Sequence, residues 1–166
     1  MPAQLAAYPV GMFIAHLPAG YLLSRSLGQR LPAAPLLIGS ICPDFDLSVV
    51  WLGLAQGNHH GFLTHRPAVW LALVMVAWLG KSRSVLALAV GALLHLCLDS
   101  VTGSIDWAWP FGSYVLGLTN WQSDPSWWPW SYLVTPKFMI ELTICATALS
   151  FWLKRKDPRP LGRGSV

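Results

Sequence analysis

Histidine and aspartate residues cluster in four short blocks of this sequence, and these residue types bind divalent metal ions. All five histidines and three of the seven acidic residues fall in the blocks. Neutral imidazole is the commonest ligand of transition metals, and carboxylate oxygens complete many such sites. The surrounding segments are apolar, and ionisable side chains in such segments are costly and tend to be functional. We therefore treat the four blocks as candidate parts of one site.

The first two blocks interrupt apolar stretches near the N-terminus. His16 lies in the middle of the first stretch, where one histidine alone is more often a packing residue than a metal ligand. The second block contains Pro43, which disfavours a continuous helix, followed by Asp44 and Asp46. A helix cap could explain one aspartate but not readily both. We expect at least one of them to bind metal.

The third block places three histidines beside an arginine: His59, His60, His65 and Arg66. Several imidazoles held by one loop can share a cation. The alternative is a solvated polar loop. His60 and His65 are the expected ligands, with His59 open as an alternative to His60. The guanidinium of Arg66 could grip a phosphate or carboxylate through two hydrogen bonds.

The fourth block, His95 and Asp99, is the strongest single signal. On a helix these residues are one turn apart and project from the same face. They could bind a metal together, or Asp99 could orient the imidazole ring of His95. A structural hydrogen bond between the two side chains is the alternative.

Five apolar stretches must position these blocks, near residues 6–24, 33–55, 67–80, 84–101 and 136–153. The chain is 54% hydrophobic and 11% charged, whereas soluble domains carry about 25% charged residues. A straight membrane span needs about 20 apolar residues. The third and fourth stretches are short and closely spaced, which predicts a tight helical hairpin. We predict an all-α, polytopic membrane bundle of about five spans over residues 1–153, with a basic tail over 154–166.

Basic residues indicate the orientation of the bundle. If all five stretches span, nine basic residues lie on one side and only Arg66 and Lys137 on the other. The positive-inside rule makes the richer side, with the C-terminus, cytoplasmic. Two loops, 56–66 and 102–135, then lie outside. A cavity that opens outward between the helices could collect all four blocks.

The second outer loop is rich in tryptophan. Six of the ten tryptophans lie in it: Trp107, Trp109, Trp121, Trp127, Trp128 and Trp130. Tryptophan favours the headgroup zone of a bilayer, so the loop could be an interfacial belt or a lid over a site that faces lipid headgroups. The sequence shows no surface of the nucleic-acid-binding type, in which basic and aromatic residues alternate.

In order and spacing, the blocks resemble the bacterial inner-membrane metal-dependent hydrolase family, whose members are often described as LexA-regulated hydrolases. The matching positions are His16, Pro43 to Asp46, Thr64-His65, His95 to Asp99, Thr102-Gly103 and Trp109 to Phe111. The resemblance covers about residues 10–115. It implies hydrolysis in the inner membrane. The third block departs from the family pattern, because it is one residue longer and has Arg66 in place of serine.

A metal-dependent hydrolase is therefore the expected function. Zinc suits a mixed histidine and aspartate set, and the expected ligands are His16, Asp44, His60, His65, His95 and Asp99. An unligated carboxylate, Asp44 or Asp46, could act as general base, while Arg66 could steady the developing oxyanion. The expected substrate is an ester or phosphoester of an amphiphilic or lipid-linked molecule in the outer leaflet. A metal-ion transporter or sensor is the main alternative, and a structural protein whose polar residues join helices is another. The oligomeric state stays open.

Overall fold

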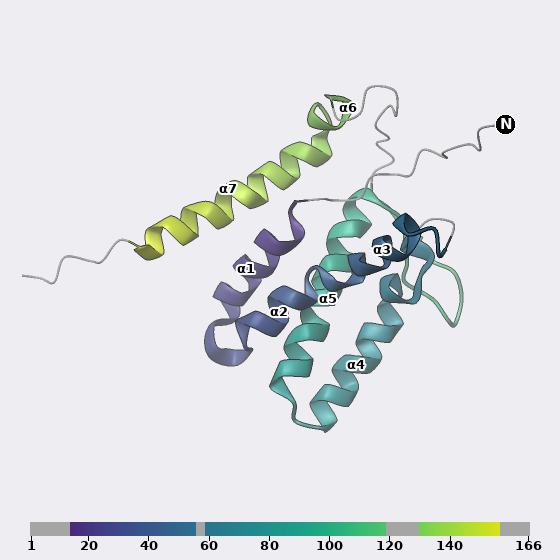
Figure 1. Ribbon diagram of the computed structural model, residues 1–166. Helices are drawn as coiled ribbons and strands as arrows, with labels where there is room; N and C mark the ends of the chain where they lie inside the picture. The colour runs from purple at the N-terminus through teal and green to yellow at the C-terminus, as the bar shows by residue number, and fades with distance from the viewer. Residues whose placement is uncertain (1–13, 56–58, 119–129, 157–166) are drawn as a thin grey trace, which may run out of the picture.

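A computed structural model describes residues 14–55, 59–118 and 130–156, and this part of the chain is mostly helical (Figure 1). The helices are α1 (His16–Leu27), α2 (Ala33–Gly39), α3 (Asp46–Trp51), α4 (Pro67–Leu79), α5 (Arg83–Thr102), α6 (Trp130–Leu133) and α7 (Pro136–Lys156). Short 3-10 turns connect them: η1 (Gly28–Arg30), η2 (Cys42–Phe45), η3 (His59–Gly61) and η4 (Leu63–His65). A two-stranded antiparallel hairpin, β1 (Ile105–Asp106) and β2 (Val115–Leu116), pairs Ile105 with Leu116.

Helix α5 is the centre of the bundle, with α2 on one side and α4 on the other (Figure 1). Glycines allow α2 and α5 to approach each other closely. A Cβ atom added to Gly39 would lie 2.0 Å from the carbonyl oxygen of Leu88, and one added to Gly91 would lie 2.1 Å from that of Leu36. Small residues at such crossings are typical of helix packing in membranes. This crossing brings the end of α2 against the middle of α5.

The second apolar stretch, residues 33–55, is broken near Pro43, as the proline predicted. Helix α2 ends at Gly39, the turn η2 follows, and the chain continues in α3 with a bend of 50°. Pro43 causes the break, because it lacks the N–H that an α-helix needs at that position. The pair α2 and α3 is therefore a broken span or a re-entrant segment.

Two helices of the described part, α5 and α7, are long and apolar enough to cross a membrane, or three segments if the bent pair counts as one. These two helices confirm the fourth and fifth predicted stretches, and α4 and α5 form the predicted hairpin. Helix α4 has 13 residues, which spans only about 20 Å. Helix α1 begins at His16, so this residue starts the helix instead of lying in its middle. Residues 6–13 of the first predicted stretch lie outside the described part.

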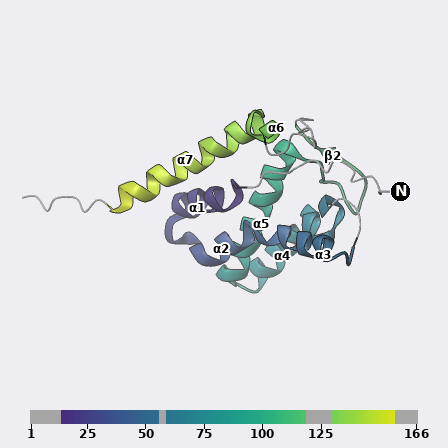
Figure 2. The ribbon, with the colours of Figure 1, turned by 45° about the horizontal axis from the view of Figure 1, so that its top comes forward.

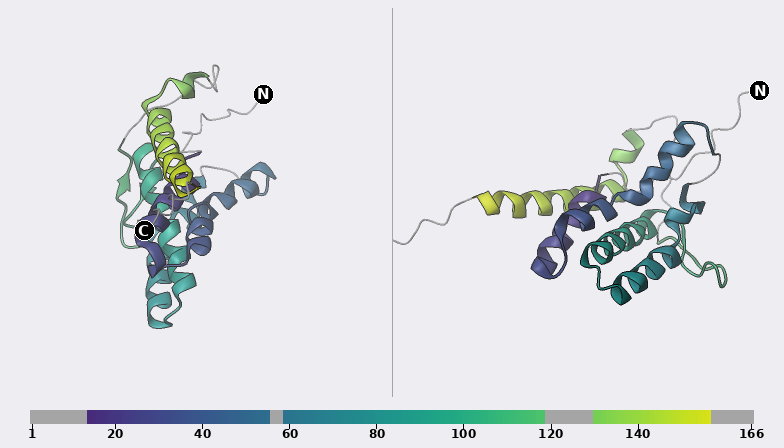
Figure 3. Two further views of the ribbon diagram at one scale, coloured as in Figure 1. Left: turned by 90° about the vertical axis from the view of Figure 1, so that its left-hand side faces the viewer. Right: turned by 60° about the horizontal axis from the view of Figure 1, so that its bottom comes forward.

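Helix α7 packs against α1, on the side of the bundle away from α4 (Figure 3). Many of its large apolar side chains are exposed, among them Met139, Leu149, Phe151 and Trp152. Helix α4 likewise exposes Trp78 and Leu79. Contiguous apolar surface of this kind suits contact with lipid. The basic tail begins inside α7, and residues 157–166 lie outside the described part.

The first half of the predicted tryptophan-rich loop folds back as the hairpin, beside the end of α5 (Figure 2). The indole N–H of Trp107 donates a hydrogen bond to the hydroxyl of Ser100 at 2.8 Å, and the N–H of Leu118 donates to the Ser100 carbonyl at 2.9 Å. Ile105 of the hairpin joins a buried core with Trp70. Trp130 of the predicted belt begins α6 and is exposed, whereas Trp121, Trp127 and Trp128 lie outside the described residues.

Candidate metal centre

Four of the predicted ligands converge at the outer end of α5 in the predicted topology. Asp44 comes from η2, His65 from η4, and His95 and Asp99 from α5. One nitrogen or carboxylate oxygen of each residue lies within 4.8 Å of those of the other three. The bend after α2 brings Asp44 to this point, and the loop before α4 brings His65. Residues more than 50 positions apart along the sequence thus meet in one cluster.

The separations between these atoms match the edges of a metal coordination polyhedron. Nε2 of His95 lies 3.0 Å from Oδ2 of Asp99 and 3.4 Å from Oδ1 of Asp44. Nε2 of His65 lies 3.6 Å from each of the same two oxygens. Tetrahedral zinc with bonds of about 2.0–2.1 Å requires ligand atoms about 3.3 Å apart. The donor set therefore fits a zinc-sized cation.

Backbone geometry orients the imidazole ring of His95. Because η2 replaces the α-helix, the N–H of Asp44 donates to the carbonyl of Ile41 instead of that of Ser40. The Ser40 carbonyl oxygen is then available and lies 3.0 Å from Nδ1 of His95. A carbonyl can only accept, so Nδ1 carries a proton, and in the neutral ring Nε2 presents its lone pair to the cluster.

A carboxylate orients the imidazole ring of His65. Nδ1 of His65 lies 2.9 Å from Oδ2 of Asp46, which also accepts a hydrogen bond from the hydroxyl of Thr64. Burial alone would lower the pKa of His65, but the hydrogen bonds with Asp44 and Asp46 outweigh it and raise that pKa. Partners of this kind fix the ring and tautomer of metal-binding histidines.

Buried atoms without hydrogen bonds mark the centre of the cluster. The side chains of His65, His95 and Asp99 are at most 2% exposed. Among the described residues, neither Nε2 of His95 nor Oδ2 of Asp99 makes a hydrogen bond, although they lie only 3.0 Å apart. If the His95 ring is neutral with its proton on Nδ1, both atoms are acceptors, and two acceptors this close require a cation between them, either a second proton on Nε2 or a metal ion. The two further ligand atoms, on Asp44 and His65, make this position suitable for a metal ion.

The two remaining predicted ligands flank Asp99. Nε2 of His16 lies 3.2 Å from Oδ1 of Asp99, and the His16 ring stacks on that of His95 with centroids 3.9 Å apart. Nε2 of His60 lies 3.9 Å from Oδ2 of Asp99. Gly103 makes room for the His60 ring, because a Cβ atom there would lie 2.4 Å from Cε1. His60 is thus beside the cluster, whereas the side chain of His59 lies outside the described part.

Asp46 and Arg66, the predicted general base and oxyanion partner, have other contacts in the structure. Asp46 is engaged by His65 and Thr64, as described above. The guanidinium of Arg66 donates to Asp106 at 3.2 Å and to the carbonyl of Gly61 at 3.2 Å. It also lies 5.7 Å from the centre of the Trp109 ring. These contacts tie the histidine-rich block to the hairpin.

Several residues of this arrangement escaped the sequence-based prediction. They are the hydrogen-bonding residues Ser40 and Asp106 and the hydrogen-bonded pair Tyr132 of α6 and Glu141 of α7, whereas Thr64 and Gly103 were named only as positions of the family pattern. Only Glu141 carried a usable signal, because a carboxylate in an apolar helix is costly. The hydroxyls and the Ser40 carbonyl acquire their roles through contacts between distant segments.

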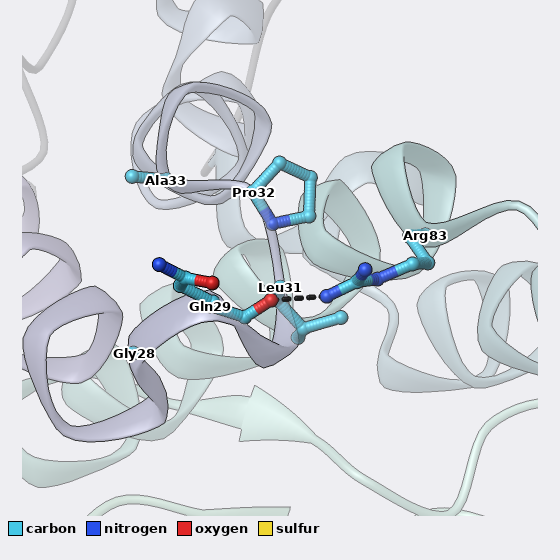
Figure 4. Close-up of a pocket in the computed structure, with 6 residues that line it drawn as sticks. All are labelled: Gly28, Gln29, Leu31, Pro32, Ala33 and Arg83. Carbon is cyan, nitrogen blue, oxygen red and sulfur yellow. Dashed lines mark hydrogen bonds between the residues drawn. The ribbon is translucent and has the colours of Figure 1, made fainter.

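A cavity of about 480 Å³ lies elsewhere in the molecule, lined by η1, the start of α2 and Arg83 (Figure 4). Arg83 donates to the carbonyls of Gln29 and Arg30 and so ties η1 to the start of α5. His95 follows twelve residues later on the same helix, a rise of about 18 Å. The cavity is therefore separate from the His/Asp cluster.

The apolar helices and the buried His/Asp cluster together define a helical membrane protein with a candidate metal centre. The chain belongs to the YdjM inner membrane protein family, whose model matches residues 9–157. This membership supports the predicted location in the inner membrane. The comparison with curated proteins gives no match, and neither does the comparison with solved structures.

Proposed function

We propose that this protein is a metal-dependent hydrolase of the inner membrane that binds a divalent cation, preferably zinc, through Asp44, His65, His95 and Asp99. The observation that carries the proposal is the convergence of two imidazole nitrogens and two carboxylate oxygens, all within 4.8 Å of one another. Bound there, the cation would supply a Lewis acid that polarises a carbonyl or phosphoryl oxygen and activates water.

The protein's own residues divide the remaining tasks. Ser40 and Asp46 hold the Nδ1 protons of His95 and His65, so that the opposite nitrogens are available for binding. Asp44 is the member of the cluster that reaches solvent, since its side chain is 32% exposed. Substrate and water therefore approach the centre past Asp44.

Arg66 serves at the rim of the site in this proposal. Its hydrogen bond to Asp106 and its position over Trp109 anchor the hairpin beside the histidine-rich loop. An ester or phosphoester of an amphiphilic or lipid-linked molecule suits a site at the edge of an apolar helical bundle. Exposed apolar residues near the rim, such as Leu63 and Phe111, suit contact with the acyl part of such a substrate.

The proposal includes the five-span topology with a cytoplasmic C-terminus. It counts the bent pair α2 and α3 as one span and includes the shorter helices α1 and α4. The support is the distribution of basic residues, nine on one side and two on the other. In this orientation the His/Asp cluster faces the outer leaflet.

Elemental analysis of the detergent-purified protein tests the metal centre. We expect about one zinc ion per wild-type chain and loss of that zinc in His65→Ala and His95→Ala, because each substitution removes a ligand. Cys97→Ala is the matched control, since Cys97 is exposed and lies two residues from His95 on the same helix. Equal metal content in all variants would refute the site.

Hydrolysis is tested on the same preparations. Chromogenic carboxylic esters, phosphomonoesters, phosphodiesters and amides are presented in mixed micelles. We expect turnover of an ester or phosphoester that a chelator abolishes and added zinc restores. Protein that retains metal but hydrolyses none of these compounds, and instead carries zinc into sealed vesicles, would support the transporter.

A further inference from the structure

A buried carboxylate on α7 lies at the start of α1, outside the candidate metal centre. Oε2 of Glu141 accepts hydrogen bonds from the backbone N–H of Ile14 at 2.6 Å and of Ala15 at 3.1 Å. Its other oxygen accepts from the hydroxyl of Tyr132. Glu141 is fully buried, and Lys137, one turn earlier on α7, is 2% exposed.

This contact supplies a cap that α1 lacks in its own sequence. Ala15 precedes the helix, and no side chain at this N-cap position accepts a hydrogen bond. The first N–H groups of a helix have no partner within it, and unpaired backbone groups are costly in an apolar environment. A carboxylate also suits the positive end of the helix dipole. Glu141 therefore determines where α1 begins and how its first turn is held.

The residue that follows the cap is His16, the first residue of α1. Its Nε2 lies 3.2 Å from Oδ1 of Asp99, and its ring stacks on His95 at an interplanar angle of 21°. Because Ala15 and His16 are adjacent, a shift of the capped backbone moves the His16 ring. That ring contacts both residues that α5 contributes to the cluster.

We propose that Glu141 is a positioning residue that acts on the metal centre through the first turn of α1 and His16. This inference rests on the proposed metal-binding function. Helix α7 supplies no residue to the four-residue cluster. In this proposal its role is to hold His16 against Asp99. Glu141 itself does not contact the cation.

Titration with Co²⁺ alone tests the inference, because the visible spectrum of bound cobalt reports ligand geometry as well as affinity. We expect Glu141→Ala to weaken Co²⁺ binding about 10-fold and to shift the spectrum, as for other residues that orient ligands indirectly. Glu141→Gln keeps an oxygen acceptor, so we expect it to weaken Co²⁺ binding less than Glu141→Ala does. Thr143→Ala is the control, since Thr143 is exposed on α7 and its hydroxyl donates to the carbonyl of Met139 on the same helix.

A double variant separates positioning from a general effect on stability. If Glu141 acts through His16, Glu141→Ala adds no further loss of Co²⁺ affinity in a His16→Ala background. Fully additive losses, or an unchanged affinity and spectrum in folded Glu141→Ala, would overturn the inference. If Glu141→Ala yields no folded protein, Glu141→Gln takes its place, and its Co²⁺ affinity is compared with that of the wild type and in the His16→Ala background. A wild-type protein that binds no Co²⁺ would instead refute the proposed function itself.

Discussion

The position of single protons determines what the candidate centre can bind. Nδ1 of His95 faces a carbonyl oxygen and Nδ1 of His65 faces a carboxylate, so both rings hold their proton on the side away from the cluster. In the neutral rings both Nε2 atoms are then lone-pair donors. Ser40 supplies its carbonyl only because Pro43 ends the α-helical hydrogen-bond pattern. A residue that breaks a helix thus orients a ligand on another helix.

Asp46 is the residue whose predicted role the geometry most alters. If it orients His65, Asp46→Ala lowers zinc affinity about 10- to 100-fold, and Asp46→Asn lowers it less because the amide oxygen can still accept from Nδ1. Competition with a chromogenic chelator measures these affinities. Ser48→Ala on the same helix is the control, since Ser48 is exposed. Unchanged zinc affinity with lost hydrolysis would instead support the general base that the sequence suggested.

At the level of helices, the crossing of α2 and α5 determines the shape of the site. Ser40 follows the last residue of α2, and Asp44 follows four positions later, so a displacement of α2 moves both. The close approach depends on glycine at positions 39 and 91. Small residues that appear unremarkable in an apolar sequence therefore position polar atoms of the centre.

Gly91→Ala tests this dependence. The added Cβ atom would lie 2.1 Å from the Leu36 carbonyl oxygen and 2.9 Å from the Ser40 nitrogen, so α2 must shift. We expect a loss of about 1–3 kcal/mol in the free energy of unfolding, together with weaker zinc binding. Thermal unfolding in detergent and zinc titration measure the two effects. Gly112→Ala is the control, because its nearest contact would be an ordinary 3.9 Å. Wild-type behaviour of Gly91→Ala would show that α2 is not held by this contact.

For the whole molecule, the proposed topology makes a direct prediction about the two sides of the membrane. A fluorescent protein fused after residue 166 should fluoresce in the cytoplasm, and alkaline phosphatase at the same place should be inactive. A second fusion, in the α4–α5 turn at Lys81, should behave identically because both sites belong to the basic side. Active phosphatase at the C-terminus would contradict five spans with this orientation.

Much of the architecture was predictable because composition and periodicity act locally. The apolar runs predicted α5 and α7 almost to their ends, and the short connection at Lys81 predicted the α4–α5 hairpin. Pro43 also predicted the break in the second stretch, where the chain bends by 50° at η2. The mid-helix position of His16 was wrong. Its helix begins there, and Glu141, 125 positions away in sequence, accepts a hydrogen bond from the N–H of the preceding residue, Ala15.

The sequence by itself determined that the chain is a membrane protein and predicted that histidine and aspartate carry its chemistry, because both conclusions depend only on residue type and local pattern. Tertiary structure decided how these residues are arranged. It brought ligand atoms of Asp44, His65, His95 and Asp99 within 4.8 Å of one another. It also gave Asp46 and Arg66 other hydrogen-bond partners. Such relations depend on a helix bend, a glycine crossing and hydrogen bonds between distant segments, and none of these is a property of neighbouring residues.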